Sequence, residues 1–402
     1  MARVTQAQAI QREVEAQALA FFESALAALP DPRRAQGTRY PLRSVVVIAL
    51  MAMVCGSDDA EAMELWGKAN EKWLSGFLEL PHGTPTQDVF LMVFAALDAV
   101  AFSGVFRAWA ELLSLRLKAT GRQIAIDGKT SRRSFDSAKG QPALHTVSAW
   151  LSEAGLVLGQ CKTADKSNEI IAIPELLGVL DLSGARVTID AIGCQTEIAS
   201  TIVERGGDYL LSVKENQPTL HQDIVRTFVE SANPRRRGRD ELSRPAVAMH
   251  EEHDKGHGRV ERRKVSVCGD LSWVTTKERW AGLSFVAQVE RERTTLGTGK
   301  TSVELAYYIG SGPTPSAASV AQLIRGHWGI ETELHWVLDM AFREDEARHR
   351  SGNTAQNMAT LRHFALNIIR RDRKRKLGVA NCRKRAGWDR NYLIELLTNV
   401  EE

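Results

Sequence analysis

The sequence predicts an α/β protein in which a mixed β-sheet with flanking helices follows an all-helical region and is interrupted by a β-rich insertion. Residues 1–117 are rich in Ala, Leu, Met and Glu, and the composition changes to short β-branched segments from residue 122. Those segments come as three strands in hairpin order, then helix, strand, helix and strand. This order is typical of a sheet with both parallel and antiparallel neighbours.

Residues 1–117 are expected to form a domain of five or six helices. Helical sequence at 7–29, 42–56, 59–78 and 86–97 is separated by turns such as "LPHGTP". The run "SVVVIALMAMVCG" has only about a dozen residues, too few to cross a bilayer, and predicts a buried helix. The first residues carry charges throughout, unlike a signal peptide.

Residues 118–232 are predicted to form the first part of the sheet. The expected strands are 123–127, 145–152, 155–163, 186–190 and 208–214, and the expected helices are 172–180 and 195–206. Pro174 is expected in the first turn of its helix, where a missing N–H costs nothing.

The remaining chain is predicted to hold the β-rich insertion at 233–311, the second part of the core at 312–372 and a basic tail at 373–402. Two basic clusters, Arg235 to Arg239 and Arg370 to Arg385, are dense enough to contact phosphates. A solvated loop and a solvated tail explain the two clusters equally well.

The overall composition indicates an ordinary soluble globular protein. The 402 residues carry a net charge of only +3, so the total charge does not by itself indicate a nucleic-acid partner. Five scattered cysteines without a CxxC pair indicate neither a zinc site nor a disulfide framework. The expected location is a reducing cytoplasm, without a membrane partner.

Two aspartates follow predicted core strands, in "RQIAIDGKTS" and "RVTIDAIGCQ". Asp127 and Asp190 therefore come at the carboxyl ends of strands that are candidates for neighbours, which is where α/β folds place their sites. Two such carboxylates could share Mg²⁺, which prefers oxygen ligands. Capping of a turn is the alternative for each aspartate, because "DGK" and "DAIG" are both good turn sequences.

A third acid lies on a predicted helix in "RGHWGIETELHWVLDMAF". At 100° per residue, Glu331, His335 and Asp339 share one face of this helix. Together with the two aspartates, Glu331 would complete a three-carboxylate metal site. The alternative is an amphipathic helix with an acidic exposed face. A zinc protease is excluded because the sequence has no HExxH motif.

Seven motifs together carry a family resemblance. They are "AIDGKTSRRS", "HTVSAWLSEAGLVLGQ", "KSNEIIAIPELL", "VTIDAIGCQ", "KENQPTL", "HGRVERR" and "HWGIETELHWVLDMAFREDEAR". In this order, over about residues 20 to 370, they resemble the H-repeat-associated, ISAs-type branch of bacterial DD(E) insertion-sequence transposases.

This resemblance implies an RNase H-like core in which Asp127, Asp190 and Glu331 are the catalytic, metal-binding acids, with Mg²⁺ as cofactor and Mn²⁺ as a substitute. Relatives of the wider group carry Tyr, Arg, Glu and Lys around the third acid. The matching positions here hold Ile324, His327, Glu331 and Leu338, so only the glutamate is kept. Arg325, His327 or Arg348 would then grip the terminal phosphate.

Other polar residues near the acids are candidates for DNA binding. Lys129, Arg132 and Arg133 follow the first acid, and a surface turn explains them equally well. Another group, Lys214, Asn216 and Gln217, follows the strand after the second acid.

The predicted function is that of a DNA transposase which hydrolyses phosphodiester bonds at element ends and transfers the freed strand into target DNA. Its expected partners are double-stranded DNA, both element ends and target, and a second copy of the chain in a homodimer or higher oligomer. The resemblance implies that the helical domain 1–117 recognises DNA ends or makes dimer contacts, and that the protein is associated with the nucleoid in the bacterial cytoplasm. One alternative is a related recombination-promoting endonuclease without strand transfer. Another is an inactive, domesticated DNA-binding protein.

Overall fold

The computed structural model describes residues 26–34, 38–116, 122–135, 140, 142–163, 168–232, 245–256, 258–372 and 376–398. Most of the helical sequence expected at 7–29, and the basic cluster Arg235 to Arg239, lie outside these residues.

A single mixed sheet of nine strands runs through the molecule in the order β3-β2-β1-β4-β5-β9-β8-β7-β6. The predicted α/β class with a mixed sheet is confirmed. β1 is parallel to β4, β4 is parallel to β5, and the other neighbours are antiparallel. The strands are β1 (Gln123–Ser131), β2 (Leu144–Leu151), β3 (Leu156–Thr163), β4 (Arg186–Ile189), β5 (Asp208–Val213), β6 (Val247–Gly256), β7 (Arg259–Cys268), β8 (Leu283–Thr295) and β9 (Thr301–Ser311).

Three helices connect or follow the first five strands: α6 (Glu169–Leu177), α7 (Thr196–Glu204) and α8 (Pro218–Ala232). The prediction that Pro174 lies in the first turn of α6 is wrong, because the helix begins at Glu169 and Pro174 lies inside it. Five residues of α6 precede Pro174, and two of them, Ala172 and Ile173, are buried, so their packing extends the helix toward its N-terminus.

The N-terminal helices are α2 (Leu42–Val54), α3 (Ala60–Leu74), α4 (Gln87–Ala96) and α5 (Ala99–Arg116). As predicted from its apolar run, α2 is buried along nearly its whole length. No single helix in the described part of the chain is long and apolar enough to span a membrane, and α4 and α5 pass that test only as a pair bent by 92°.

The C-terminal segment folds onto these helices. The structure has α11 (Thr354–Arg370), α12 (Val379–Trp388) and α13 (Arg390–Thr398), so the prediction of a basic tail after residue 372 is wrong for residues 379–398. The reason is amphipathicity: Cys382, Tyr392 and Leu396 are buried in the same core as α2, while the basic residues lie largely on the outside.

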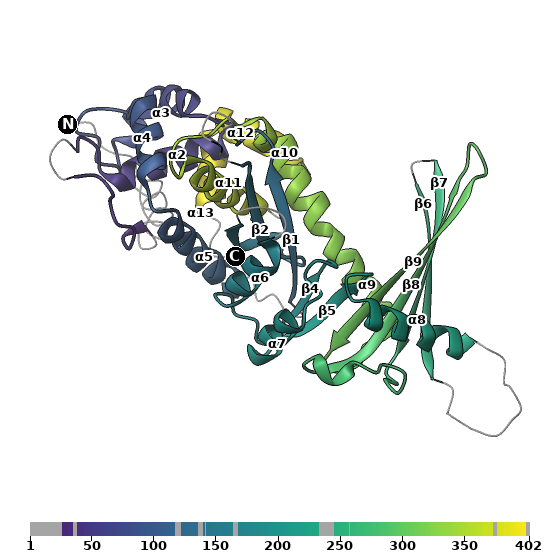
Figure 1. The fold of residues 1–402 in the computed structure, drawn as a ribbon. Helices are drawn as coiled ribbons and strands as arrows, with labels where there is room; N and C mark the ends of the chain where they lie inside the picture. Colours follow the sequence, from purple (N-terminus) through teal and green to yellow (C-terminus); the bar gives the residue numbers. More distant parts are fainter. Residues whose placement is uncertain are drawn as a thin grey trace, which may run out of the picture.

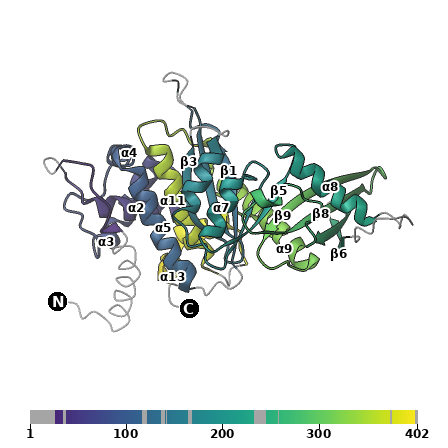
Figure 2. The same cartoon turned by 60° about the horizontal axis from the view of Figure 1, so that its bottom comes forward.

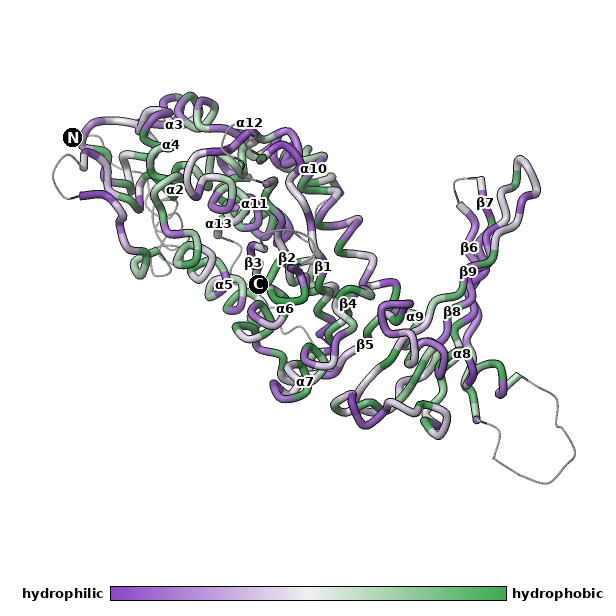
Figure 3. The backbone as a smooth tube through the Cα atoms, viewed as in Figure 1, coloured by the Kyte–Doolittle hydropathy of each residue, from purple (hydrophilic) through white to green (hydrophobic). Residues whose placement is uncertain are grey.

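The β-rich insertion continues the central sheet, because β9 pairs with β5. Figure 1 shows β6 to β9 extending away from the helices as an arm at the other end of the molecule. β6 and β7 are largely hydrophilic in Figure 3, and few of their side chains are buried toward the arm's tip. Arg262 pairs there with Glu251 and Glu292 on the adjacent strands, so charge pairs take the place of a core at the tip.

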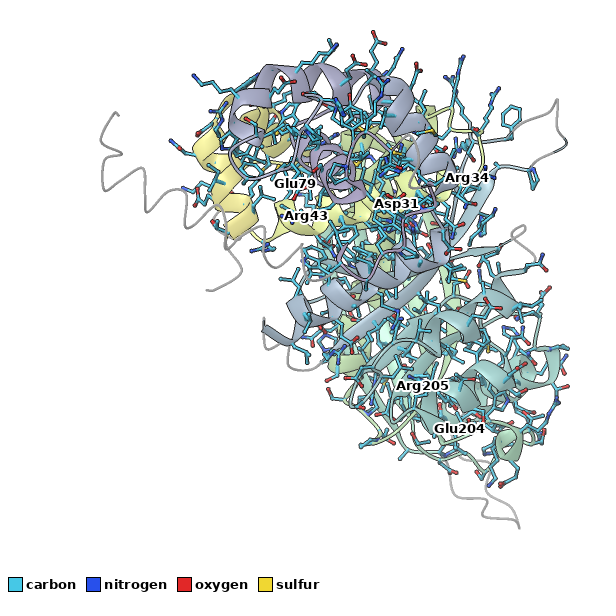
Figure 4. The ribbon with its side chains drawn as sticks, turned by 90° about the vertical axis from the view of Figure 1, so that its left-hand side faces the viewer. Asp31, Arg34, Arg43, Glu79, Glu204 and Arg205 are labelled. Carbon is cyan, nitrogen blue, oxygen red and sulfur yellow. The ribbon has the colours of Figure 1, made fainter. Side chains whose placement is uncertain are left out.

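A long helical segment follows the insertion. It consists of α9 (Ala317–Gly329), the π-helical turn η4 (Ile330–His335) and α10 (Trp336–Phe342). In Figures 1 and 2 the segment that begins with α9 leads from the arm back toward the helical end. Figure 4 labels Glu204 and Arg205, at the end of α7, well away from four residues of the N-terminal region: Asp31, Arg34, Arg43 and Glu79.

Asn367 fixes α11 to the edge strand β3. Its fully buried amide accepts from the Val157 N–H at 2.9 Å and donates to the Val157 carbonyl at 2.8 Å, as a neighbouring strand would do.

We expect Asn367→Ala to lower the free energy of unfolding by about 2–3 kcal/mol, because both backbone groups of Val157 stay buried without partners. Gln356→Ala, on the same helix, is the control and should change stability by less than about 0.5 kcal/mol. Denaturant unfolding followed by circular dichroism measures both, and equal stabilities would show that the Asn367 bonds carry little weight.

Candidate active site

Asp127 and Asp190 lie side by side on neighbouring parallel strands. Ile126 of β1 is paired with Ile189 of β4, so the next residue on each chain is one of the two aspartates. Asp190 directly follows β4, but β1 continues to Ser131 because its other edge is paired with β2. The prediction that Asp127 ends its strand is therefore wrong, although the register still places both carboxylates at the same level.

The two carboxylates repel each other. Burial, and then the charge of Asp190, raise the pKa of Asp127 from 3.8 to about 7, with a further contribution from Glu331. Burial also raises the pKa of Asp190, which Lys214 partly counteracts. This pair therefore favours a bound positive charge.

Glu331 lies in the π-helical turn η4, which packs against β1. Such turns occur frequently at functional sites because they change which side chains face a neighbour. The side chain of Glu331 is exposed, and partial burial and the charge of Asp190 raise its pKa. The structure thus brings the third acid within electrostatic reach of the first two.

Three carboxylates match the hard oxygen ligands that Mg²⁺ and Mn²⁺ prefer, and their mutual repulsion is what a divalent cation would relieve. In the arrangement described, no group of three or more His, Cys, Asp or Glu side chains among the described residues is close enough to hold a metal ion together. The three carboxylates are suitable ligands for a metal ion, and their side chains would have to move closer together to bind the same ion.

His335 and Asp339, on the predicted face of the helix, contact β1. Nδ1 of His335 lies 3.4 Å from Oδ2 of Asp127. Burial, and then the charge of Lys129, lower the pKa of His335 to about 4, so the ring is neutral at pH 7. It therefore packs beside Asp127 without neutralising it.

Lys129 does not face solvent as a DNA contact would. Its Nζ lies 2.6 Å from Asp339 and 3.0 Å from Glu344, and its side chain is only 10% exposed. Glu344 is itself buried and is also paired with Arg362. The predicted phosphate contact at Lys129 is thus contradicted, because its charge is used to hold the helix on β1.

Two more predicted DNA contacts support the loop after Asp190. The amide of Asn216 donates to the Ala191 carbonyl at 2.7 Å, and that of Gln217 donates to the Cys194 carbonyl at 2.9 Å. These bonds hold the 191–195 loop against the end of β5. Both residues therefore support this loop, and because Asn216 is also exposed, their contacts to DNA stay a prediction.

His327 is also occupied internally. Its Nδ1 lies 3.1 Å from the Thr188 hydroxyl, and burial lowers its pKa to about 4, so it carries no positive charge for a phosphate. A phosphate contact at His327 would therefore have to use the N–H of a neutral ring, and it stays a prediction. The remaining predicted cations are exposed: Arg132, Arg133, Lys214, Arg325 and Arg348. Arg132 pairs with Asp345 and Arg325 with Glu252 at the surface.

Glu169, the first residue of α6, is a further acid beside the site that was not predicted from the sequence. Its carboxylate is buried and raises the pKa of both Asp127 and Asp190. The residue does not follow a strand, and an acid in the first helical turn is common because it complements the helix dipole. The only signal was its presence in the motif "KSNEIIAIPELL".

Comparison with known proteins gives a consistent result. A family model described as "Transposase DDE domain" matches residues 118–368, and one described as "DDE_Tnp_1-associated" matches residues 23–110. The chain is 36% identical to "Putative transposase YncI" of Escherichia coli O157:H7, over 94% of each chain. It is 34% identical to "H repeat-associated putative transposase YhhI" of Escherichia coli K12, over 92% of this chain and 95% of that protein.

Among solved structures, the piggyBac transposase synaptic complex with hairpin DNA matches with a TM-score of 0.42 and 11% identity, covering 96% of this chain and 81% of that one. This similarity is too low to support an inference about the present chain.

The raised pKa of Asp127 predicts a pH-dependent stability of the metal-free protein. The folded state keeps the proton up to about pH 7 and the unfolded chain releases it near 3.8, so the contribution of Asp127 becomes destabilising as pH rises through this window. In EDTA, we expect the Tm of both proteins to fall between pH 5 and pH 8. The fall should be smaller for Asp127→Asn than for wild type, and the two falls should differ by at least about 3 °C.

The exposed Asp254 on β6 supplies the control, because Asp254→Asn removes a carboxylate far from the acids and should follow the wild-type profile. Thermal unfolding of all three proteins across the pH range is the measurement. Parallel profiles for wild type and Asp127→Asn would show that Asp127 titrates normally.

Proposed function

The chain belongs to the family of transposases with a DDE domain, and from this premise we propose that it hydrolyses phosphodiester bonds at the ends of a DNA element with a divalent metal and joins the freed 3′ ends to target DNA. The observation that carries this proposal is the parallel register of β1 and β4, which sets Asp127 and Asp190 side by side near Glu331. The alternatives are an endonuclease without strand transfer and an inactive DNA-binding protein.

Asp127, Asp190 and Glu331 would hold the metal. A bound Mg²⁺ or Mn²⁺ supplies Lewis-acid activation of water and of the phosphate oxygens. The protein residues position the carboxylates: β1 and β4 set the spacing of the aspartates, Asn216 holds the loop after Asp190, and Lys129 docks the helix that carries Glu331.

In the proposed reaction, water attacks the phosphorus atom at the element end, the bond to the 3′ oxygen breaks, and a 3′-OH is released. That hydroxyl then attacks a phosphodiester of target DNA, so one bond forms as another breaks and no external energy source is needed. Because two ends must be joined to one target, the proposed assembly on DNA is a homodimer or higher oligomer in the bacterial cytoplasm.

Three exposed cations are the proposed contacts to the DNA backbone. Lys214 is exposed and its charge lowers the pKa of Asp190, which places it beside the site. Arg133 follows β1, and Arg348 follows α10; both are also exposed. A DNA strand that reaches the acids would have these three charges available for its phosphates.

We expect Asp127→Asn, Asp190→Asn and Glu331→Gln each to lower metal-dependent cleavage at least about 100-fold, because each removes a charge that would hold the metal. The substrates are labelled duplexes from the ends of the element that encodes the chain, with Mg²⁺ or with EDTA. Glu333→Gln is the control, since Glu333 lies in the same π-helical turn but pairs with Arg370.

Pre-cut ends with a free 3′-OH, incubated with plasmid, separate the candidate functions. Joined products support the transposase, whereas cleavage without joining supports the endonuclease. DNA binding without cleavage of any end, by a folded wild-type protein, supports the inactive binding protein. Cleavage that survives all three acid substitutions would contradict the assignment of the site.

We expect Lys214→Ala to reduce the slope of log K against log salt for DNA binding by about 1, because one phosphate contact is lost. The triple variant with Arg133→Ala and Arg348→Ala should reduce it by about 3. Lys277→Ala, an exposed lysine between β7 and β8, is the control. Fluorescence anisotropy at several salt concentrations gives the slopes, and an unchanged slope in the triple variant would exclude these contacts.

A further inference from the structure

Glu169 is a buried carboxylate beside the proposed metal site. Glu169 lies at the start of α6 and is only 4% exposed. Its Oε1 accepts a hydrogen bond from Nε2 of His145 at 2.7 Å. Burying a carboxylate is costly unless its charge is compensated. The groups around Glu169 should therefore show what compensates its negative charge.

Gly128 shows how close this carboxylate lies to the catalytic strand. A Cβ atom at Gly128 would be 2.3 Å from Oε1 of Glu169 and 2.8 Å from Nε2 of His145. Only glycine leaves room for both groups against the backbone of the residue that follows Asp127. The glycine at position 128 therefore leaves the space in which the Glu169 side chain lies against β1.

A chain of side chains orients the carboxylate. Nδ1 of His145 lies 2.7 Å from the Thr130 hydroxyl, which fixes the plane of the ring and directs Nε2 toward Glu169. The bond from His145 uses Oε1, and no hydrogen bond to Oε2 is found within the described residues. An oriented carboxylate with a free oxygen is the usual form of a metal ligand supported by a neighbouring residue.

The charge of Glu169 acts on the same two aspartates that we propose to bind metal. Glu169 lies against Gly128, the residue after Asp127, and Asp190 is at the same level on the neighbouring strand. A buried group that repels two neighbouring carboxylates destabilises the metal-free fold, and an apolar or neutral side chain would avoid this cost. A cation shared by the carboxylates explains why a charged one is present.

We propose that Glu169 is a fourth carboxylate of the divalent-metal centre, with His145 as the positioning residue that orients it. This proposal rests on the proposed function of Asp127 and Asp190. It assigns a role to the "KSNEIIAIPELL" segment, and it adds to the site a ligand from α6 in addition to those from β1, β4 and the π-helical turn.

Mn²⁺ binding by the full-length, DNA-free protein tests the proposal without relying on activity. By isothermal titration calorimetry, we expect Glu169→Gln and His145→Ala each to weaken Mn²⁺ binding at least about 10-fold. The rise in Tm that Mn²⁺ causes should shrink in both variants. Glu175→Gln removes an exposed carboxylate from the same helix and should bind Mn²⁺ as wild type does.

Two further variants make the outcome decisive. Glu169→Asp keeps the negative charge on a shorter side chain, which moves the carboxylate away from the site. A Mn²⁺ affinity between those of wild type and Glu169→Gln supports a ligand role for Glu169. Mn²⁺ binding by Glu169→Gln within about twofold of wild type overturns the proposal, even if the metal-free Tm is lower. Asp190→Asn distinguishes a failure of this proposal from a failure of the proposed metal centre. If Asp190→Asn also binds Mn²⁺ as wild type does, the metal centre itself is wrongly assigned. If Asp190→Asn loses Mn²⁺ binding and Glu169→Gln does not, only the role of Glu169 is wrong.

Discussion

The register between β1 and β4 is the constraint on which the site depends. Pairing of Ile126 with Ile189 sets two aspartates next to each other, and a shift of one residue would turn one of them to the other face of the sheet. The apolar residues before each aspartate are fully or almost fully buried, so the core fixes this register with the free energy of burying them. Packing of the core therefore holds the two carboxylates close together. Their repulsion cannot separate them, because separation would expose the buried apolar residues.

The helix that carries Glu331 docks onto β1 by matching two repeats. His335 contacts Asp127 and Asp339 contacts Lys129, so a step of four residues along the helix meets a step of two along the strand. Four helical residues rise about 6 Å and two strand residues about 6.6 Å, which makes the two spacings nearly equal. The buried pair of Lys129 and Glu344 then secures this alignment, because separating them would leave a charge without a partner inside the protein.

The sequence was informative where local pattern decides the structure. Short β-branched runs predicted the five core strands and, through their order, a mixed sheet, and the apolar run at 42–56 predicted the buried α2. It was uninformative where long-range contacts decide. Lys129 looks like a surface cation until α10 is packed on it, and only the fold shows that the amide of Asn216 supports the loop after Asp190. Glu169 resembles any acid at a helix start, and only the fold places it behind Gly128.

The arm and the third acid are mechanically connected. Because β9 pairs with β5, the chain returns from the insertion beside the strand that follows Asp190, and α9 starts from that position. α9 then crosses the sheet, where the amide of Gln123 on β1 donates to the Leu323 carbonyl at 2.6 Å. The same helix contacts β6 and β7 of the arm, and it continues without a break into the π-helical turn. One continuous helical segment therefore links the arm to Glu331, and its bonds to Gln123 on β1 and Thr188 on β4 hold it on the same strands that position Asp127 and Asp190.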